Sequence, residues 1–265
     1  MKDIQNLIMW VVIGIGFSSC ATNPKINYGN NSSAGHFADV DGIKLYYETY
    51  GTGIPLVMLH GNGGSIEAFK DQIPFFEQKY QVIAIDSRLH GKSGGSPDTL
   101  SYVMIADDVS KLLDVLKIDS ALVLGWSDGG IDGLILAMNH PEKVRALAVS
   151  GANIFSDSTS LPASDIEGMK SVIAENSSAS ERDKTLNRMM LYQPNLTYSD
   201  LTQKIKCPVL VMAGDRDIIK PEHTIAIFQA IRKRELCIYP NSSHGALQEN
   251  PDLFNATVSN FFERN

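Results

Sequence analysis

Residues 121–135 read ALVLGWSDGGIDGLI. A short apolar run typical of a buried strand leads into Gly125-Trp126-Ser127-Asp128-Gly129, and apolar residues then recur at helical spacing from Ile131 to Met138. A Gly-x-Ser-x-Gly motif between a strand and a helix predicts a nucleophile elbow, a sharp turn that exposes the serine hydroxyl above a sheet. The glycines on either side let backbone segments pass closely. We therefore predict Ser127 to be a nucleophile.

The rest of the chain alternates strand and helix patterns around this elbow. A hairpin is expected over residues 37–50, with Asp41-Gly42 as its turn. The further apolar runs typical of buried parallel strands are 55–59, 82–85, 121–124, 144–149, 208–213 and 236–239. Helical spacing lies between them, for example over 109–116 and 253–261. This alternation predicts an α/β fold, a mostly parallel doubly wound sheet flanked by helices, in which the strand-free stretch 155–206 forms a helical lid.

A serine hydroxyl needs a base near neutral pH, and after a nucleophile elbow the acid and then the histidine follow along the chain. His244 lies in a loop directly after the strand run that ends at Tyr239, where it can reach Ser127. His223 follows Pro221 at a helix start, and we expect it to face solvent. His244 is therefore the predicted base.

The predicted acid is one of two aspartates that follow the strand run 208–213. Asp217 lies further out on the loop than Asp215, as the acid of this arrangement usually does. Asp215 is expected to order the turn or to pair with Arg216. Asp157, after the preceding strand, remains an alternative. We predict Asp217 as the acid that orients His244.

An oxyanion hole requires two N–H donors, one after the nucleophile and one from the loop after an earlier strand. The stretch His60-Gly61-Asn62-Gly63-Gly64 follows the strand 55–59. The backbone amides of Asn62 and Asp128 are the predicted donors. His60 is interpreted as a structural turn residue, because its strand precedes the elbow.

Composition argues against several other functions. The chain has 265 residues with 23 Lys and Arg against 30 Asp and Glu, a net charge of −7, which gives no support for nucleic-acid binding. The stretch Gly91-Lys92-Ser93 resembles part of a phosphate-binding loop, but Asp86 occupies the position of the first glycine of that motif. No glycine fingerprint for a dinucleotide follows a strand, and no cluster has metal-ligand spacing. We expect no cofactor and no metal.

The N-terminus has the pattern of a targeting segment. Lys2 precedes an apolar run over residues 7–17, which is too short to span a bilayer and ends in Ser18-Ser19-Cys20. Residues 1–19 are predicted to be a signal peptide of the bacterial lipoprotein type, with Cys20 lipidated and the protein exported to the cell envelope. A plain signal peptide of a secreted or periplasmic soluble protein is the alternative. Residues 20–35, poor in apolar side chains, are expected to form a flexible tether before a domain spanning 36–265.

These motifs resemble the α/β-hydrolase family across residues 37–263. The stretches 124–131 and Ser150-Gly151-Ala152-Asn153 are most similar to the biphenyl-hydrolase-like, or valacyclovir-hydrolase, branch. The resemblance implies the same nucleophile, acid and base. It also implies that the carboxylate of Asp128 can hold the amino group of an amino-acid ester; a helix N-terminus would favour a negative charge there in any case.

The sequence as a whole predicts a serine hydrolase of small carboxylic esters. The lid side chains of Met169, Met189, Met190, Leu191 and Tyr192 are able to line an apolar acyl pocket, or only to pack against the sheet. A carbon–carbon bond hydrolase, perhydrolase, lactonase or thioesterase on the same triad is an alternative, and so is a binding protein of the cell envelope without turnover.

Overall fold

A computed structural model describes residues 26–193 and 195–265. The predicted signal peptide and Cys20 lie outside these residues. One sheet crosses the molecule, with strands β1 (Gly35–Val40), β2 (Ile43–Tyr50), β3 (Ile54–Leu59), β4 (Tyr80–Ile85), β5 (Ala121–Trp126), β6 (Val144–Ser150), β7 (Val209–Gly214) and β8 (Arg234–Tyr239). Their order is β1-β2-β4-β3-β5-β6-β7-β8. The hairpin is antiparallel, β2 is antiparallel to β4, and the strands from β3 to β8 run parallel.

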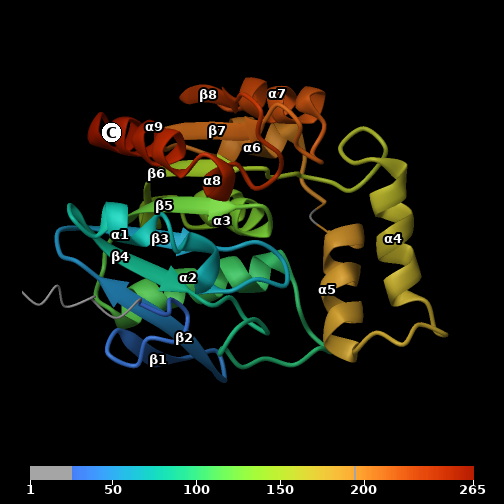
Figure 1. Cartoon of the computed structure of the whole chain (residues 1–265), viewed down its shortest axis with the longest axis horizontal. Coiled ribbons are helices and arrows are strands. Elements are labelled where there is room, and N and C mark those ends of the chain that lie inside the picture. Colours follow the sequence, from blue (N-terminus) through green and yellow to red (C-terminus); the bar gives the residue numbers. More distant parts are fainter. Residues whose placement is uncertain (1–25, 194) are drawn as a thin grey trace, which may run out of the picture.

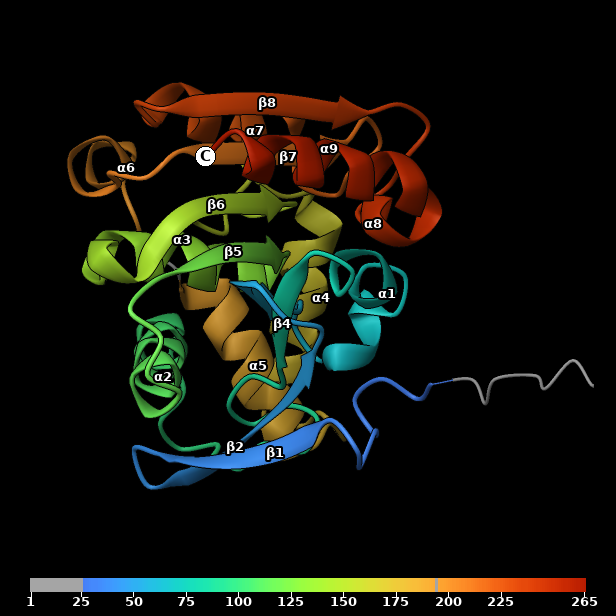
Figure 2. The same ribbon diagram turned by 90° about the vertical axis from the view of Figure 1, so that its left-hand side faces the viewer.

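Helices cover both faces of the sheet (Figures 1 and 2). They are η1 (Ile66–Phe69), α1 (Ile73–Phe76), α2 (Tyr102–Val115), α3 (Asp128–Asn139), η2 (Pro141–Lys143), α4 (Ala163–Ile173), α5 (Glu181–Tyr192), α6 (Tyr198–Lys204), α7 (Pro221–Ala230), α8 (Ala246–Glu249) and α9 (Pro251–Glu263). This arrangement confirms the predicted α/β fold. No helix of the described ranges is long and apolar enough to cross a bilayer.

Alternation along the central strands divides the core into two layers. Val57 and Leu59 of β3 join one apolar cluster, which includes residues of α2 and α3. Leu56 and Met58 point to the other face, where α1 and α9 contribute. These four side chains are fully buried. The continuous apolar runs in the sequence therefore reflect strands that are covered on both sides.

The predicted lid is shorter than the stretch 155–206. Helices α4 and α5 pack against each other and stand beside the sheet (Figure 1). Helix α6 instead contacts α3 and α7, and its Leu201 is buried in the main core. Helical spacing alone does not reveal which surface a helix packs against. The predicted lid therefore included α6.

The predicted tether is also shorter than expected, because its C-terminal part packs on the sheet. Glu48 of β2 is fully buried, and its carboxylate accepts the backbone amides of Gly29 and Asn31, each at 2.8 Å. It also accepts the hydroxyls of Tyr46 and Tyr50. The segment is held through its backbone amides, so its lack of apolar side chains did not indicate that it packs on the sheet.

Candidate active site

Ser127 occupies a strained turn between β5 and α3. Its φ of 56° and ψ of −122° lie outside the regions that side chains ordinarily adopt. A Cβ on Gly125 would lie 2.2 Å from the carbonyl oxygen of Gly129, and a Cβ on Gly129 would lie 2.0 Å from that of Leu59. The two glycines of the motif are therefore required by close backbone contacts, and they hold Ser127 at the end of the sheet.

The structure brings Ser127 and His244 together. His244 lies in the loop between β8 and α8, and its Nε2 is 2.8 Å from the Ser127 Oγ. The indole N–H of Trp126 donates to the His244 carbonyl at 2.8 Å, which ties this loop to the elbow. The imidazole can thus accept the serine proton without a further movement of the backbone.

Asp217 completes the chain of hydrogen bonds. Its Oδ1 lies 2.7 Å from His244 Nδ1 and also accepts the backbone amide of Ile219. The Asp217 side chain is 1% exposed, whereas that of His244 is 19% exposed. Such a buried carboxylate orients the imidazole and stabilises its protonated form.

The competing aspartates have other partners. Asp215 accepts the backbone amides of Asn241 and Ser242, so it joins the loop after β7 to the loop after β8. Asp157 accepts the amide and hydroxyl of Thr159, within its own turn. These hydrogen bonds fit turn-ordering roles for both residues.

The remaining histidines near the site are buried and neutral. His60 accepts the Ser87 amide, and burial first and then neighbouring charge lower its pKa to about 3. His223 was expected to face solvent, which is wrong: it is 2% exposed and accepts the amide of Ile154. Burial lowers the pKa of His223 to about 4. The position of His223 at a helix start did not indicate that this helix packs against the loop after β6.

The two predicted oxyanion donors lie beside the serine. Asp128 is the first residue of α3, where a helix has no preceding carbonyl to accept the amide. The loop after β3 approaches so closely that a Cβ on Gly61 would lie 2.9 Å from the Ser127 Cβ. Within the described part of the chain, the Asn62 amide has no protein acceptor. Both amides are therefore available to a substrate oxygen.

The carboxylate of Asp128 is buried and holds the same loop. Its Oδ2 accepts the side-chain amide of Asn62 at 2.8 Å. Burial raises the pKa of Asp128 to about 6, against the opposing effect of Asn62. Asp132, one helical turn further on, is also buried, and burial raises its pKa well above the usual range. Of these two acids, Asp128 is closer to the nucleophile along the chain, because it directly follows Ser127.

A small cavity of about 40 Å³ adjoins Ser127 and His244. Its other lining residues are Tyr102, Asp128, Asn153, Ser156, Leu161, Met169, Met190, Ile218 and Ile219. Of the predicted lid residues, Met169 and Met190 line it. Met189 and Leu191 are buried elsewhere, and Tyr192 is 66% exposed. The lining of the cavity therefore combines apolar and polar side chains.

Sequence reasoning missed most of the cavity. Ile218 and Ile219 directly follow the predicted acid, so their position in sequence could have indicated them. Tyr102 begins α2, and its buried hydroxyl lies close to the carboxylate of Asp128. No local pattern near Tyr102 indicates that it reaches a site formed by residues in later parts of the chain.

Metal-ligating residues do not gather at this site or elsewhere in residues 26–193 and 195–265. No group of three or more His, Cys, Asp or Glu side chains in these ranges could hold an ion.

Comparison with known proteins agrees with this architecture. Residues 54–178 match the family model described as the alpha/beta hydrolase fold. The human serine hydrolase BPHL is 27% identical over 91% of this chain and 90% of its own length. RutD of Azorhizobium caulinodans is 36% identical, but the match covers only 43% of this chain and 42% of that protein.

The crystal structure of a bromoperoxidase from Bacillus anthracis superposes with a TM-score of 0.77 at 20% identity, covering 87% of this chain and 100% of that one. At this identity the likeness establishes the fold alone. The chain is therefore a protein of the α/β-hydrolase fold.

Proposed function

We propose that this protein is a serine hydrolase that cleaves small carboxylic esters through an acyl-enzyme on Ser127. The observation that carries the proposal is the continuous line of hydrogen bonds from Ser127 Oγ to His244 at 2.8 Å and from His244 to Asp217 at 2.7 Å. Three loops after β5, β7 and β8 meet to form it. Such a constellation activates a serine for acyl transfer.

The reaction follows from this geometry in two halves. The Ser127 oxygen attacks the ester carbonyl while His244 Nε2 takes its proton, and the amides of Asn62 and Asp128 stabilise the oxyanion. The tetrahedral intermediate then expels the alcohol, which takes the proton back from His244. A water molecule, activated by the same imidazole, attacks the acyl-enzyme and releases the carboxylic acid and free Ser127.

The cavity supports a preference for short acyl groups. A hollow of about 40 Å³ with apolar side chains in its lining has room for only a few heavy atoms. The Asp128 carboxylate in its lining would stabilise an ammonium group on that acyl portion, as in an amino-acid ester. Its hydrogen bond to Asn62 supports a second role, in which it fixes the oxyanion loop.

A substrate panel tests this proposal. We expect p-nitrophenyl acetate to be hydrolysed with a higher kcat/KM than p-nitrophenyl octanoate, with little turnover of matched thioesters or lactones. The Ser127→Ala variant serves as the blank. Exclusive turnover of a lactone or thioester would contradict the ester assignment, and full activity in Ser127→Ala would contradict the mechanism.

For the location of the protein, we propose lipid attachment at Cys20, which lies outside the described residues. The support is the sequence pattern before it, and stable attachment needs more than one acyl chain. We expect the wild type to sediment with membranes and to need detergent for extraction. A wild type that fractionates as soluble would favour a plain cleaved signal peptide.

A further inference from the structure

A second hollow lies next to the elbow, and it differs from the small cavity in size and in charge. This groove has a volume of about 580 Å³ and shares no lining residue with the cavity beside Ser127. Trp126, the residue before Ser127, forms part of it, as do Gly63 and Gly64 of the oxyanion loop. The groove therefore borders the reacting centre along two of the segments that build it.

Three glycines leave the floor of the groove open. Gly63, Gly64 and Gly91 contribute no side chain, and a Cβ on Gly63 would meet nothing within 4 Å. Gly91, in contrast, has no room for a side chain, since a Cβ there would lie 2.0 Å from an oxygen of Asp86. The space above the loop therefore stays open because these three residues are glycines.

The groove carries an excess of positive charge in an acidic protein. Arg182 of α5 and Lys70 at the end of η1 line it, against a single acid, Glu67. Arg182 is fixed by donating Nε–H to the Leu89 carbonyl at 2.9 Å, and its nearest carboxylate oxygen, on the neighbouring Asp183, is 3.5 Å away. Among the ion pairs of the described residues, none involves the Lys70 amine. Both cations therefore retain donors for a ligand.

The nearby histidines add no charge of their own. His60 and His90 are buried, with ring centroids 5.1 Å apart. Burial is the main cause that lowers their pKa values, to about 3 and about 4, and the charge of Arg182 lowers both further. The cationic lining of the groove therefore comes from Arg182 and Lys70 alone among these residues.

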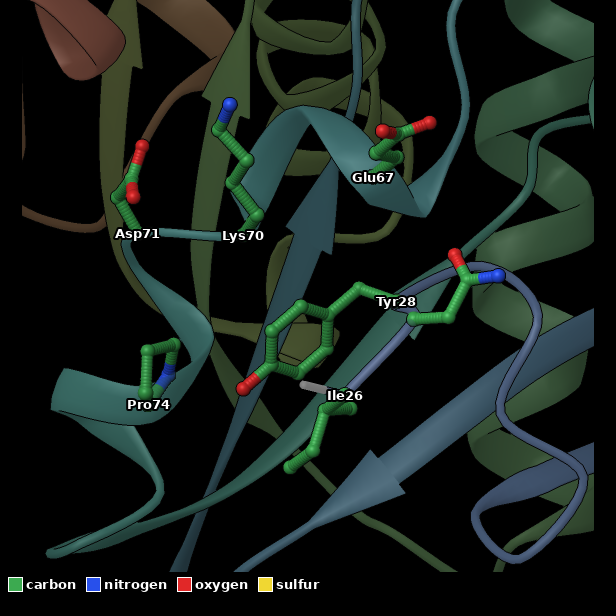
Figure 3. A pocket seen from close by; sticks show the side chains of 7 residues that line it. Ile26, Tyr28, Glu67, Lys70, Asp71 and Pro74 are labelled. Carbon is green, nitrogen blue, oxygen red and sulfur yellow. The ribbon is translucent and has the colours of Figure 1, made fainter. Parts of the chain in front are cut away.

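A neighbouring hollow of about 660 Å³ is a less suitable site for a reacting group. Glu67 and Lys70 line it too, but so do Asp71, Tyr28 and Ile26, and no residue of the elbow or of the oxyanion loop reaches it. Figure 3 shows the side chains of Lys70 and Glu67 extending from η1 away from the Tyr28 ring. Lys70 therefore borders both hollows, and of the two only the groove is also lined by residues of the elbow and of the oxyanion loop.

We propose that the groove binds the alcohol portion of the substrate and selects alcohols that carry an anionic group, a carboxylate or a phosphate. The inference rests on the proposed ester hydrolysis, because a carbonyl has two substituents and the small cavity holds only the acyl one. Arg182 forms the planar, multidentate contacts that suit carboxylates and phosphates, and Lys70 adds a point charge. The cationic groove also attracts such esters to an otherwise acidic surface.

A matched pair of substrates isolates the charge. 4-Acetoxybenzoate and its methyl ester have the same acetyl group and the same aromatic leaving group, and differ in the para substituent. Each kcat/KM is divided by the rate constant for hydroxide hydrolysis, which removes the intrinsic difference between the leaving groups. We expect the wild type to favour the anionic ester by about tenfold at low salt, and less at 0.5 M salt because screening weakens exposed charges.

Two variants and a control assign that preference to the groove. Arg182→Gln and Lys70→Gln should each reduce the anionic-to-neutral ratio several-fold. Arg188→Gln, which removes an exposed cation from the same helix but not from the groove, should leave the ratio unchanged. 4-Phosphonooxyphenyl acetate, compared with phenyl acetate, shows whether a phosphate is preferred to a carboxylate.

The outcomes separate the groove from the catalytic proposal. Turnover of both benzoate esters with equal corrected kcat/KM, or a ratio that survives both groove variants, would overturn the groove assignment and leave ester hydrolysis intact. If neither ester shows turnover that depends on Ser127, the proposed function is overturned, and this inference with it.

Discussion

The sheet and the lid contribute different things to this molecule. Ser127, Asp217 and His244 are carried by loops at the ends of β5, β7 and β8, strands that are buried between two apolar layers. Helices α4 and α5 instead form, with Leu161 and Ile219, a small separate cluster and contribute Met169 and Met190 to the cavity wall. The difference suggests that chemistry depends on the sheet and selectivity on the lid. Variants on the sheet should then affect all esters equally, and variants on the lid should not.

The largest effect is expected from the nucleophile and the base. Ser127→Ala and His244→Ala should each reduce kcat by a factor on the order of 10⁶, by analogy with subtilisin, because the triad acts as a unit. The double variant should be little worse than either single one. Kinetics with p-nitrophenyl acetate and butyrate measures this, and losses that multiply in the double variant would break the shared mechanism.

The acid is expected to follow. Asp217→Asn removes the charge that orients His244 and should lower kcat by about 10⁴ for every ester. Asp215→Asn is the matched control on the same loop, and it should cost less than tenfold because Asp215 contacts backbone amides rather than the imidazole. A larger loss in Asp215→Asn than in Asp217→Asn would assign the acid to Asp215.

Lid variants should alter selectivity rather than chemistry. Met190→Ala enlarges the cavity and should raise the octanoate-to-acetate ratio of kcat/KM by about tenfold, since longer acyl chains then bury more apolar surface. Tyr192→Ala, which removes an exposed side chain from the same helix, is the control and should leave the ratio unchanged. An equal loss on all chain lengths in Met190→Ala would remove the distinction between sheet and lid.

Asp128 lies between the two regions, and pH distinguishes its two roles. Its carboxylate, with a pKa raised to about 6, is mostly protonated at pH 5 and mostly ionised at pH 7, while an α-ammonium group remains charged over that interval. The kcat/KM of an aminoacyl ester relative to the acetate ester should therefore rise about tenfold from pH 5 to 7. Taking the ratio removes any pH dependence that the two esters share.

Asp128→Asn is the variant that tests this reading. With no ionisable group at position 128, the ratio should stay flat between pH 5 and 7, and the acetate ester should be little affected. Equal loss on both esters would assign Asp128 to holding Asn62 and the oxyanion loop.

The sequence patterns predicted the sheet, and they singled out Ser127, Asp217 and His244, which the structure brings into hydrogen-bond contact. The strand runs are continuous because both faces of the sheet are covered, and the motif around Ser127 is fixed by backbone contacts that only glycine permits. His244 and Asp217 could be placed because parallel strands end at one edge of a sheet. The strands and the elbow depend on residues close in sequence, and a general rule of parallel sheets supplies the rest.

The misplaced features depend on contacts between distant segments. His223 is buried by the loop after β6, and residues from Gly29 onward are held by Glu48, a residue about twenty positions away. Tyr102 reaches the cavity from the start of α2, and Leu161 from the loop before α4. No periodicity or motif in any of these segments indicates its partner.

Covalent labelling by a fluorophosphonate probe reports whether Ser127 is an activated nucleophile. Phosphonylation requires an activated serine, and peptide mapping identifies the residue that carries it. We predict rapid labelling of the wild type at Ser127, much slower labelling of His244→Ala, and none of Ser127→Ala. Labelling at another residue, or a wild type that stays unlabelled while its fold is intact by circular dichroism, would show that Ser127 is not an activated nucleophile.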